Sequence, residues 1–305
     1  MHAALLRRVR RGLPVAARRA FSSTGPSEAG GSILVRPIDG QDAVVELRMC
    51  APPVNTFTRG VLEEFTTTLR SLEEEGSTRG VVLTSGCPRV FSAGLDLKEM
   101  HRPPRDEFVA YWTMFEKMWK RWYLSPLVTC SAVNGNCPAL GAVMALSSDV
   151  RVMVHDKAFR MGLNETALGM NPPVWLRGLC ERTLGARNAE FHLQASTMAS
   201  PDQALALGYV DRLVVPPSSE DNNEDEAEAR LIEAALAEMA PLLRIPAQAR
   251  AQTKHGFRAA LAAEADHGAS VEVMADSVLG AEFQATVDGI LTAMKKKSEA
   301  RRKNV

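Results

Sequence analysis

Apolar residues recur at two spacings that predict an alternation of strands and helices. Four apolar, β-branched runs have the length of strands, and they cover residues 33–36, 43–49, 80–84 and 127–133. After the second run, apolar residues return at helical spacing from Val61 to Leu72 with glutamates between them, which predicts an amphipathic helix. A helix of small residues is predicted to begin near Leu140. Because strands alternate with helices, we expect an α/β core over residues 32–215.

The C-terminal part of the chain has a different pattern. Residues 216–228 are acidic and poor in apolar residues, so we expect a solvated linker there. Beyond it, apolar stripes at helical spacing begin at Leu231 and again at Val271. Residues 229–305 are therefore predicted to form an all-helical region.

The first residues have the composition of a targeting segment. Residues 1–27 contain six arginines and no acidic residue among Ala, Leu and Val, which is typical of a mitochondrial presequence. We assign residues 1–31 to this presequence and a spacer, and we expect a mitochondrial matrix protein. The alternative is a basic arm that binds an acidic partner. No apolar run approaches the ~20 residues of a membrane span, and the last residues do not match the peroxisomal Ser-Lys-Leu signal.

Composition narrows the classes of function. Hydrophobic residues make up 46% of the chain, and Lys plus Arg equals Asp plus Glu at 36 each, so net charge gives no general attraction to nucleic acid. Two basic clusters, at residues 117–123 beside aromatic residues and at residues 295–303, leave RNA binding open, although such clusters are more often the solvated face of a helix or a solvated chain end. The five cysteines form no Cys-x-x-Cys pair and the histidines are scattered, so no metal site is expected.

Residues 90–100, VFSAGLDLKEM, have the features of a turn that binds an anionic oxygen through its backbone. Backbone N–H groups that converge on one point stabilise an oxyanion without titrating, and Gly94 permits the close approach this needs. Asp96 and Glu99 have the spacing of a capping box, so a helix should begin directly after Asp96. We interpret both carboxylates as helix caps before catalysts.

Two further segments belong with this turn. Residues 134–142, NGNCPALGA, form a second predicted turn from strand to helix, where small residues let a helix N-terminus approach a ligand oxygen. Residues 162–169, GLNETALG, contain the carboxylate of Glu165. For an unknown chain, Glu165 is equally well explained as a surface helix cap after Asn164.

Together these segments resemble the crotonase superfamily and, within it, the mitochondrial Δ3,Δ2-enoyl-CoA isomerases, from about Ile33 to the end of the chain. The resemblance implies an α/β crotonase (ClpP-like) fold of repeated ββα units, with C-terminal helices that build a homotrimer. It implies an acyl-CoA substrate and movement of its double bond from position 3 to position 2 in mitochondrial β-oxidation of unsaturated fatty acids. It implies no cofactor, since coenzyme A is part of the substrate.

The same resemblance implies roles for individual residues. The oxyanion donors would be the backbone N–H groups of Leu95 and Leu140, and Glu165 would shuttle the proton. The hydratases of the superfamily use a second glutamate at the position of Val143, so a valine there favours an isomerase over a hydratase, the nearest alternative. The residues implied in substrate binding are Ala93, Gly94, Leu95, Asp96, Leu97, Leu140 and Asn164.

Some positions leave alternatives open. Many relatives have glycine where this chain has Leu140, and aliphatic residues where it has Asn171, which puts the pocket shape and the acyl chain preference in question. A non-enzymatic RNA-binding or scaffold relative is therefore a further alternative. Asn164 either positions the thioester or caps a turn. The apolar residues expected to line an acyl tunnel, or else to lie in the core, are Phe159, Leu163, Met170, Pro172, Pro173, Val174 and Trp175.

Overall fold

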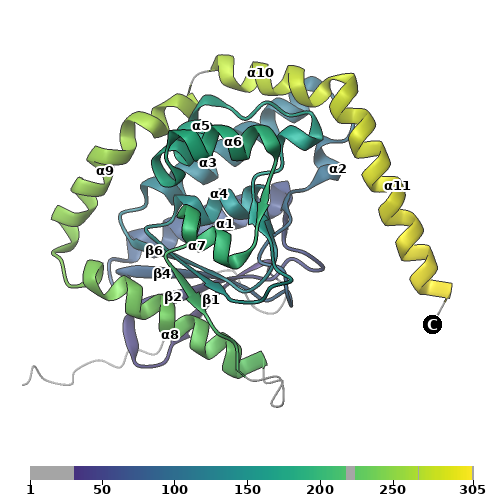
Figure 1. Ribbon diagram of the computed structural model, residues 1–305. Coiled ribbons are helices and arrows are strands. Elements are labelled where there is room, and N and C mark those ends of the chain that lie inside the picture. Colours follow the sequence, from purple (N-terminus) through teal and green to yellow (C-terminus); the bar gives the residue numbers. More distant parts are fainter. Residues whose placement is uncertain (1–30, 218–223, 267, 304–305) are drawn as a thin grey trace, which may run out of the picture. The chain divides into compact units, whose positions relative to one another are not determined.

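A mixed sheet organises the fold of residues 31–217, 224–266 and 268–303, which are the residues that the computed structural model describes (Figure 1). Within these residues the main sheet has six strands in the order β1-β2-β4-β6-β8-β11. The strands are β1 (Ile33–Ile38), β2 (Gln41–Met49), β4 (Gly80–Ser85), β6 (Val128–Val133), β8 (Val150–Val154) and β11 (Arg212–Val214). β1 and β2 are antiparallel and the other neighbours are parallel. The four predicted strands are confirmed.

Each of four long strands is followed by a two-residue strand and then by a helical segment. These units are β2-β3-α1, β4-β5-α2, β6-β7-α4 and β8-β9-η1. The short elements are β3 (Thr56–Phe57), β5 (Gly94–Leu95), β7 (Cys137–Pro138), β9 (Met161–Gly162), α2 (Leu97–Met100), α4 (Leu140–Ser147) and the 3₁₀ turn η1 (Thr166–Leu168), and α1 spans Arg59–Glu75. This is the predicted ββα repeat, and α4 begins where its small residues predict. The repeat places the ends of the short strands beside one another.

Helices cover both faces of the sheet, and β4 and β6 are therefore buried along their whole length. On one face, α1, α3 (Arg105–Leu124) and α4 contribute to the larger core. On the other face lies α8 (Glu224–Leu243) (Figure 1). Its Leu231 and Met239 belong to a second core cluster with Val82 and Cys130 of the sheet. The remaining elements are α5 (Val174–Leu184), α6 (Ala186–Ala195), β10 (Met198–Ala199), α7 (Pro201–Leu207), α9 (Ala247–Ala263), η2 (Glu264–Asp266), α10 (Gly268–Leu279) and α11 (Ala281–Lys303).

The predicted linker at residues 216–228 is wrong in its second half, because α8 already begins at Glu224. Three acidic residues fill the first turn of this helix, where the positive end of the helix dipole stabilises them. Glu228 also forms an ion pair with Arg48 of β2 and a 3.3 Å pair with Arg36 of β1. The acidic composition thus reflects a helix start and contacts with the sheet.

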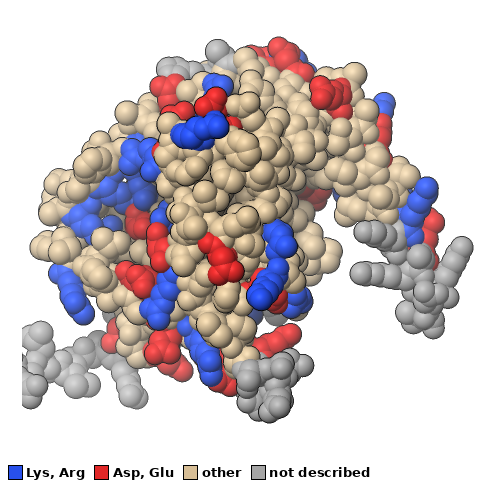
Figure 2. All heavy atoms as spheres, in the orientation of Figure 1, with Lys and Arg blue, Asp and Glu red and all other residues tan. Residues whose placement is uncertain are grey.

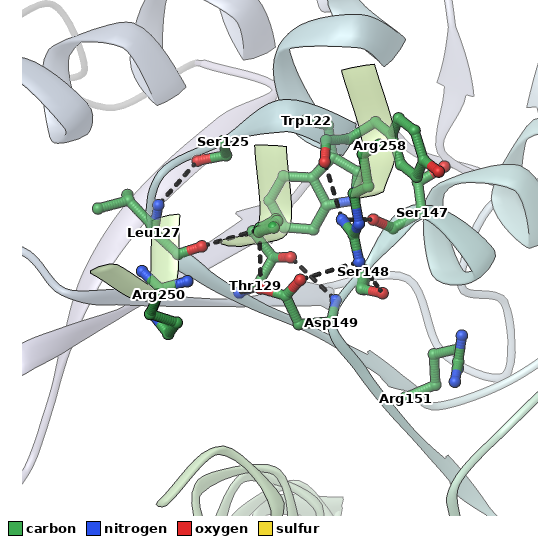
Figure 3. Close-up of polar contacts among 12 residues, drawn as sticks. Trp122, Ser125, Leu127, Thr129, Ser147, Ser148, Asp149, Arg151, Arg250 and Arg258 are labelled. Atoms are coloured by element: carbon green, nitrogen blue, oxygen red, sulfur yellow. Dashed lines mark hydrogen bonds and ion pairs between the residues drawn. The ribbon is translucent and has the colours of Figure 1, made fainter. Parts of the chain in front are cut away.

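A buried ion cluster fixes α9 to the core (Figure 3). The carboxylate of Asp149 accepts hydrogen bonds from Lys254 Nζ at 2.7 Å and from the backbone N–H of Thr129 at 3.0 Å, and it lies 2.9 Å from the guanidinium of Arg258. Arg258 also donates to the carbonyl oxygens of Ser147 and Ser148, at the C-terminal end of α4. Figure 2 shows Lys and Arg side chains gathered beside α9. The positive charge of Arg258 therefore stabilises the negative end of the α4 dipole.

The structure bears differently on the predicted presequence, the expected absence of a membrane span and the basic cluster of α3. The presequence, apart from Gly31, lies outside the described residues. Among the described helices, none combines the length and hydropathy of a membrane span. In the basic cluster of α3, Trp119 and Trp122 are fully buried, so these rings cannot stack on the bases of an RNA.

Candidate active site

A mostly apolar cavity of about 150 Å³ lies among α2, α3, α4, α5 and η1, at the ends of the short strands. Six residues implied by the sequence or the resemblance line it: Ala93, Leu95, Leu97, Leu140, Asn164 and Glu165. Gly94 and Asp96, also expected in substrate binding, are not among the lining residues, although their neighbours in sequence, Ala93, Leu95 and Leu97, are. The cavity thus combines a mostly apolar wall with a few polar groups, as ligand sites do.

The first turn presents the backbone of Leu95. Its neighbour Asp96 donates its N–H to Phe57 O of β3 at 3.3 Å, and Gly94 donates to Ser92 Oγ at 3.1 Å. Successive residues of a strand direct their N–H groups to opposite sides, so the N–H of Leu95 faces away from β3. Leu95 lines the cavity, and its backbone N–H is therefore placed to donate to a ligand.

The second turn ends in the N-terminus of α4. Leu140 is the first residue of this helix, and the first N–H groups of a helix have no intrahelical acceptor. The two turns approach closely, because a Cβ atom on Gly94, where φ is +94°, would lie 3.2 Å from the backbone N of Leu140. Ala139, in the second turn, has φ of 49° and ψ of −126°, a conformation that residues other than glycine rarely adopt and that costs about 1 kcal/mol or more.

Direct hydrogen bonds hold the two turns in this arrangement. Phe91 donates its N–H to Asn136 O, and Asn136 donates to Arg89 O, each at 2.9 Å. Ala139 donates to Gly162 O at 2.9 Å, and β7 pairs with β9 in parallel. The segment that contains Glu165 is thereby linked to the second turn.

The predicted capping box at the first turn is half correct. Asp96 caps α2, since its carboxylate accepts from the N–H of Lys98 at 2.9 Å. Glu99 does not return to the backbone of Asp96; it pairs with Arg59 of α1 at 3.0 Å. A nearby cation competes successfully for this carboxylate because a charge-assisted hydrogen bond is stronger than one to a neutral amide.

Glu165 precedes η1 and is buried, with 9% of its surface exposed. Its Oε2 has no hydrogen-bond partner among the described residues, and the same holds for Oδ1 of the adjacent Asn164. Buried polar atoms are usually paired, so both oxygens are available to hydrogen-bond a molecule that enters the cavity. Burial raises the pKa of the Glu165 carboxyl to about 7. A surface helix cap, the alternative role for Glu165, is excluded by this burial.

The apolar lining agrees only partly with the sequence-based expectation. Met170, Pro172, Pro173 and Trp175 line the cavity as expected. Phe159 and Leu163 lie in the core, and Val174 and Asn171 are exposed. Asn171 therefore neither shortens nor wets the cavity, because it is exposed and is not among the lining residues.

The sequence reasoning missed part of the wall. Trp112 and Phe115 of α3, Leu176 of α5, Met274 of α10 and Ile290 of α11 also line the cavity. Their helical spacing is a signal for burial alone, which does not distinguish core from cavity. Val143 of α4 is another lining residue, so the position of the hydratases' second glutamate faces this space. Among the described residues, no three His, Cys, Asp or Glu side chains are grouped to hold a metal ion.

Comparison with known proteins gives consistent matches. The family model described as enoyl-CoA hydratase/isomerase matches residues 39–286. The mitochondrial enoyl-CoA delta isomerase 1 of mouse is 40% identical over 224 residues, 73% of each chain. The human protein of that name is 40% identical over 231 residues, 76% of this chain and 72% of its own. The crystal structure of the human mitochondrial delta3-delta2-enoyl-CoA isomerase superposes with a TM-score of 0.80 at 35% identity, over 88% of this chain and 99% of that one.

Proposed function

The chain belongs to the enoyl-CoA hydratase/isomerase family, with the crotonase fold that its sequence predicts, and we propose that it is an enoyl-CoA delta isomerase. Its substrate is a 3-cis or 3-trans enoyl-CoA, and its product is the 2-trans isomer. One observation carries this proposal: among the described residues that line the cavity, Glu165 is the one carboxylate, and it lies there with Val143 and the N-terminus of α4. Isomerisation needs one group that accepts and returns a proton, whereas hydration also needs a group that activates water.

The reaction follows from this arrangement. Glu165 removes a proton from C2 of the acyl chain, and the electron pair of the broken C–H bond spreads over C2, C4 and the thioester oxygen. The N–H groups of Leu95 and Leu140 donate to that oxygen, where the negative charge of the dienolate collects. Glu165 then gives its proton to C4, and the double bond lies between C2 and C3. No atom is gained or lost, and no cofactor takes part.

The environment of Glu165 suits this exchange. The carboxyl must be ionised to take the first proton and acidic enough to return it, which is best met by a pKa near the working pH. Burial supplies such a pKa, about 7. Asn164, whose Oδ1 is also unpartnered, is placed to orient the thioester or the carboxylate.

The cellular setting belongs to the same proposal. Relatives at 40% identity are named mitochondrial, and residues 1–27 have the composition of a presequence. These two facts support a role in the matrix, in β-oxidation of unsaturated fatty acids. The helical C-terminal region supports a homotrimer.

The test is conversion of 3-hexenoyl-CoA to 2-hexenoyl-CoA by the purified protein and by Glu165→Gln. We expect turnover by the parent and a loss of kcat of about a hundredfold or more in the variant. Hydration of 2-hexenoyl-CoA, measured in parallel, should be slow because Val143 cannot activate water. Faster hydration than isomerisation would support the hydratase alternative, and an equally active Glu165→Gln would remove Glu165 from the mechanism.

A further inference from the structure

Aromatic side chains of α3 and α5 form one wall of the cavity. Trp112, Phe115 and Trp175 all line it, and each is at most 3% exposed. The rings of Trp112 and Phe115 meet edge to face at 5.1 Å, and the ring of Phe115 lies 5.7 Å from that of Trp175. Trp175 in turn stacks on Trp119 at 4.0 Å. An acyl chain that enters the cavity therefore meets a continuous aromatic surface.

A buried carboxylate stands directly behind this wall. Glu116 of α3 is 3% exposed, and its Oε1 accepts a hydrogen bond from Trp112 Nε1 at 2.9 Å and another from Trp175 Nε1 at 3.0 Å. Glu116 is not part of the cavity lining. One oxygen thus fixes two indoles that come from helices far apart in the sequence, and a tryptophan ring held by its N–H group cannot swing away without leaving a buried donor unpaired.

On the basis of the proposed function, we infer that Glu116 is a positioning residue that locks the aromatic wall and thereby restricts the enzyme to short acyl chains. The size of the cavity supports this restriction. A cavity of similar volume, engineered in another protein, holds a benzene molecule, which has six carbon atoms. The cavity of about 150 Å³ accordingly suits an acyl chain of similar size. A longer chain has to displace part of the wall, and where it meets Trp112 or Trp175, Glu116 opposes the displacement.

Substitutions of Glu116 can separate the effect of its hydrogen bonds from the effect of its charge. Because both indoles donate to the same oxygen, a glutamine at this position can keep both hydrogen bonds through its carbonyl oxygen. A leucine has a similar volume but accepts neither bond. Trp112→Phe keeps an aromatic ring in the wall and removes one bond only. These three variants form a graded series.

The experiment compares kcat/KM for 3-hexenoyl-CoA and 3-dodecenoyl-CoA in the parent, Glu116→Gln, Glu116→Leu and Trp112→Phe. We expect the parent to favour the six-carbon substrate. Glu116→Leu should reduce this preference about tenfold, mainly through a lower KM for the longer substrate. Glu116→Gln should leave the preference unchanged within error, and Trp112→Phe should lie between. Glu107→Leu, at an exposed position of the same helix, is the matched control and should match the parent.

Two other results overturn the inference. A parent that uses both substrates equally well would show that the wall does not select, and equal losses for both substrates in Glu116→Leu would show a purely structural role. Binding of hexanoyl-CoA and dodecanoyl-CoA, followed by tryptophan fluorescence in the same proteins, reports on the wall without turnover. If no 3-enoyl-CoA is converted by the parent, the proposed function fails, while a length preference in binding that Glu116→Leu removes would still uphold the lock.

Discussion

The environment of Glu165 sets both the pKa of its carboxyl and its effect on the free energy of unfolding. The carboxyl is buried in an apolar cavity, and Oε2 finds no hydrogen-bond partner among the described residues. Burial disfavours the ionised form, which raises the pKa to about 7. The ionised form is the catalytic one for proton removal. We therefore expect kcat/KM for 3-hexenoyl-CoA to rise with pH and to level off above about pH 7; a profile flat from pH 5 to pH 9 would contradict this.

The same raised pKa predicts that Glu165→Gln stabilises the protein at alkaline pH. A carboxyl with a higher pKa in the folded state stabilises that state fully below its unfolded pKa of 4.5, and this contribution is lost as pH rises through about 7. The shift corresponds to about 3 kcal/mol. Urea unfolding at pH 8 should show a higher free energy of unfolding for Glu165→Gln than for the parent, and at pH 4.5 the gain should disappear. A loss of stability at both pH values would contradict this view of the site.

At the scale of elements, the site depends on two turns that nearly touch. Gly94→Ala adds a Cβ atom 2.9 Å from Ala139 Cβ and 3.2 Å from Leu140 N, in a conformation with positive φ. The turns must separate, and displaced donors lose much of their effect, so we expect kcat to fall about a hundredfold. Gly76→Ala is the matched control, because Gly76 also has positive φ but no atom within 4 Å of an added Cβ.

The control should lose some stability and keep its kcat. If both variants lost activity to the same degree, strain at positive φ alone would explain the effect, and the contact between the turns would carry no catalytic weight.

The attachment of α9 gives a second prediction at this scale. Asp149→Asn leaves the cations of Lys254 and Arg258 buried without their counter-charge, although it nearly preserves the shape of the side chain. Removing one partner of such a buried pair is expected to lower the free energy of unfolding by about 3 kcal/mol. Glu190→Gln, which removes an exposed pair with Arg187, should change it little. Equal unfolding midpoints for the two variants in urea would show that the cluster is not stabilising.

The sequence predicted local features better than pairings between distant segments. Strands such as β4 and the start of α4 follow from apolar runs and small residues, and Glu165 follows from its motif. The contact of Glu116 with Trp175 joins residues 59 positions apart, and no local pattern indicates it. The sequence predicts a bond from Glu99 to the nearby backbone of Asp96, because its actual partner, Arg59, is far away in the sequence. Asn171 lies in an irregular segment, where periodicity does not indicate which way a side chain points.

At the scale of the whole molecule, several large apolar side chains of the C-terminal helices are exposed. Phe257 and Ile245, in and before α9, are 70% and 46% exposed, and Met294 of α11 is 54% exposed. Burial of such side chains between subunits would favour association, while the homotrimer itself is predicted from the family resemblance. We expect sedimentation equilibrium to give a mass three times that of one chain, and we expect Phe257→Glu to weaken the assembly. A monomer at micromolar concentration would contradict the predicted homotrimer.

The residue at position 143 also bears on how readily this site could change its reaction. Codons for valine and glutamate can differ by a single base, so one nucleotide change could add a second carboxylate to the wall of the cavity that Glu165 lines. That carboxylate would be buried, since Val143 is 2% exposed, and it would share the cavity with Glu165, which is partly ionised at neutral pH because its pKa is about 7. The genetic step from isomerase towards hydratase is therefore short, while the physical step is steep. For this chain, a change of reaction is therefore limited less by mutation than by the solvation of a second buried charge.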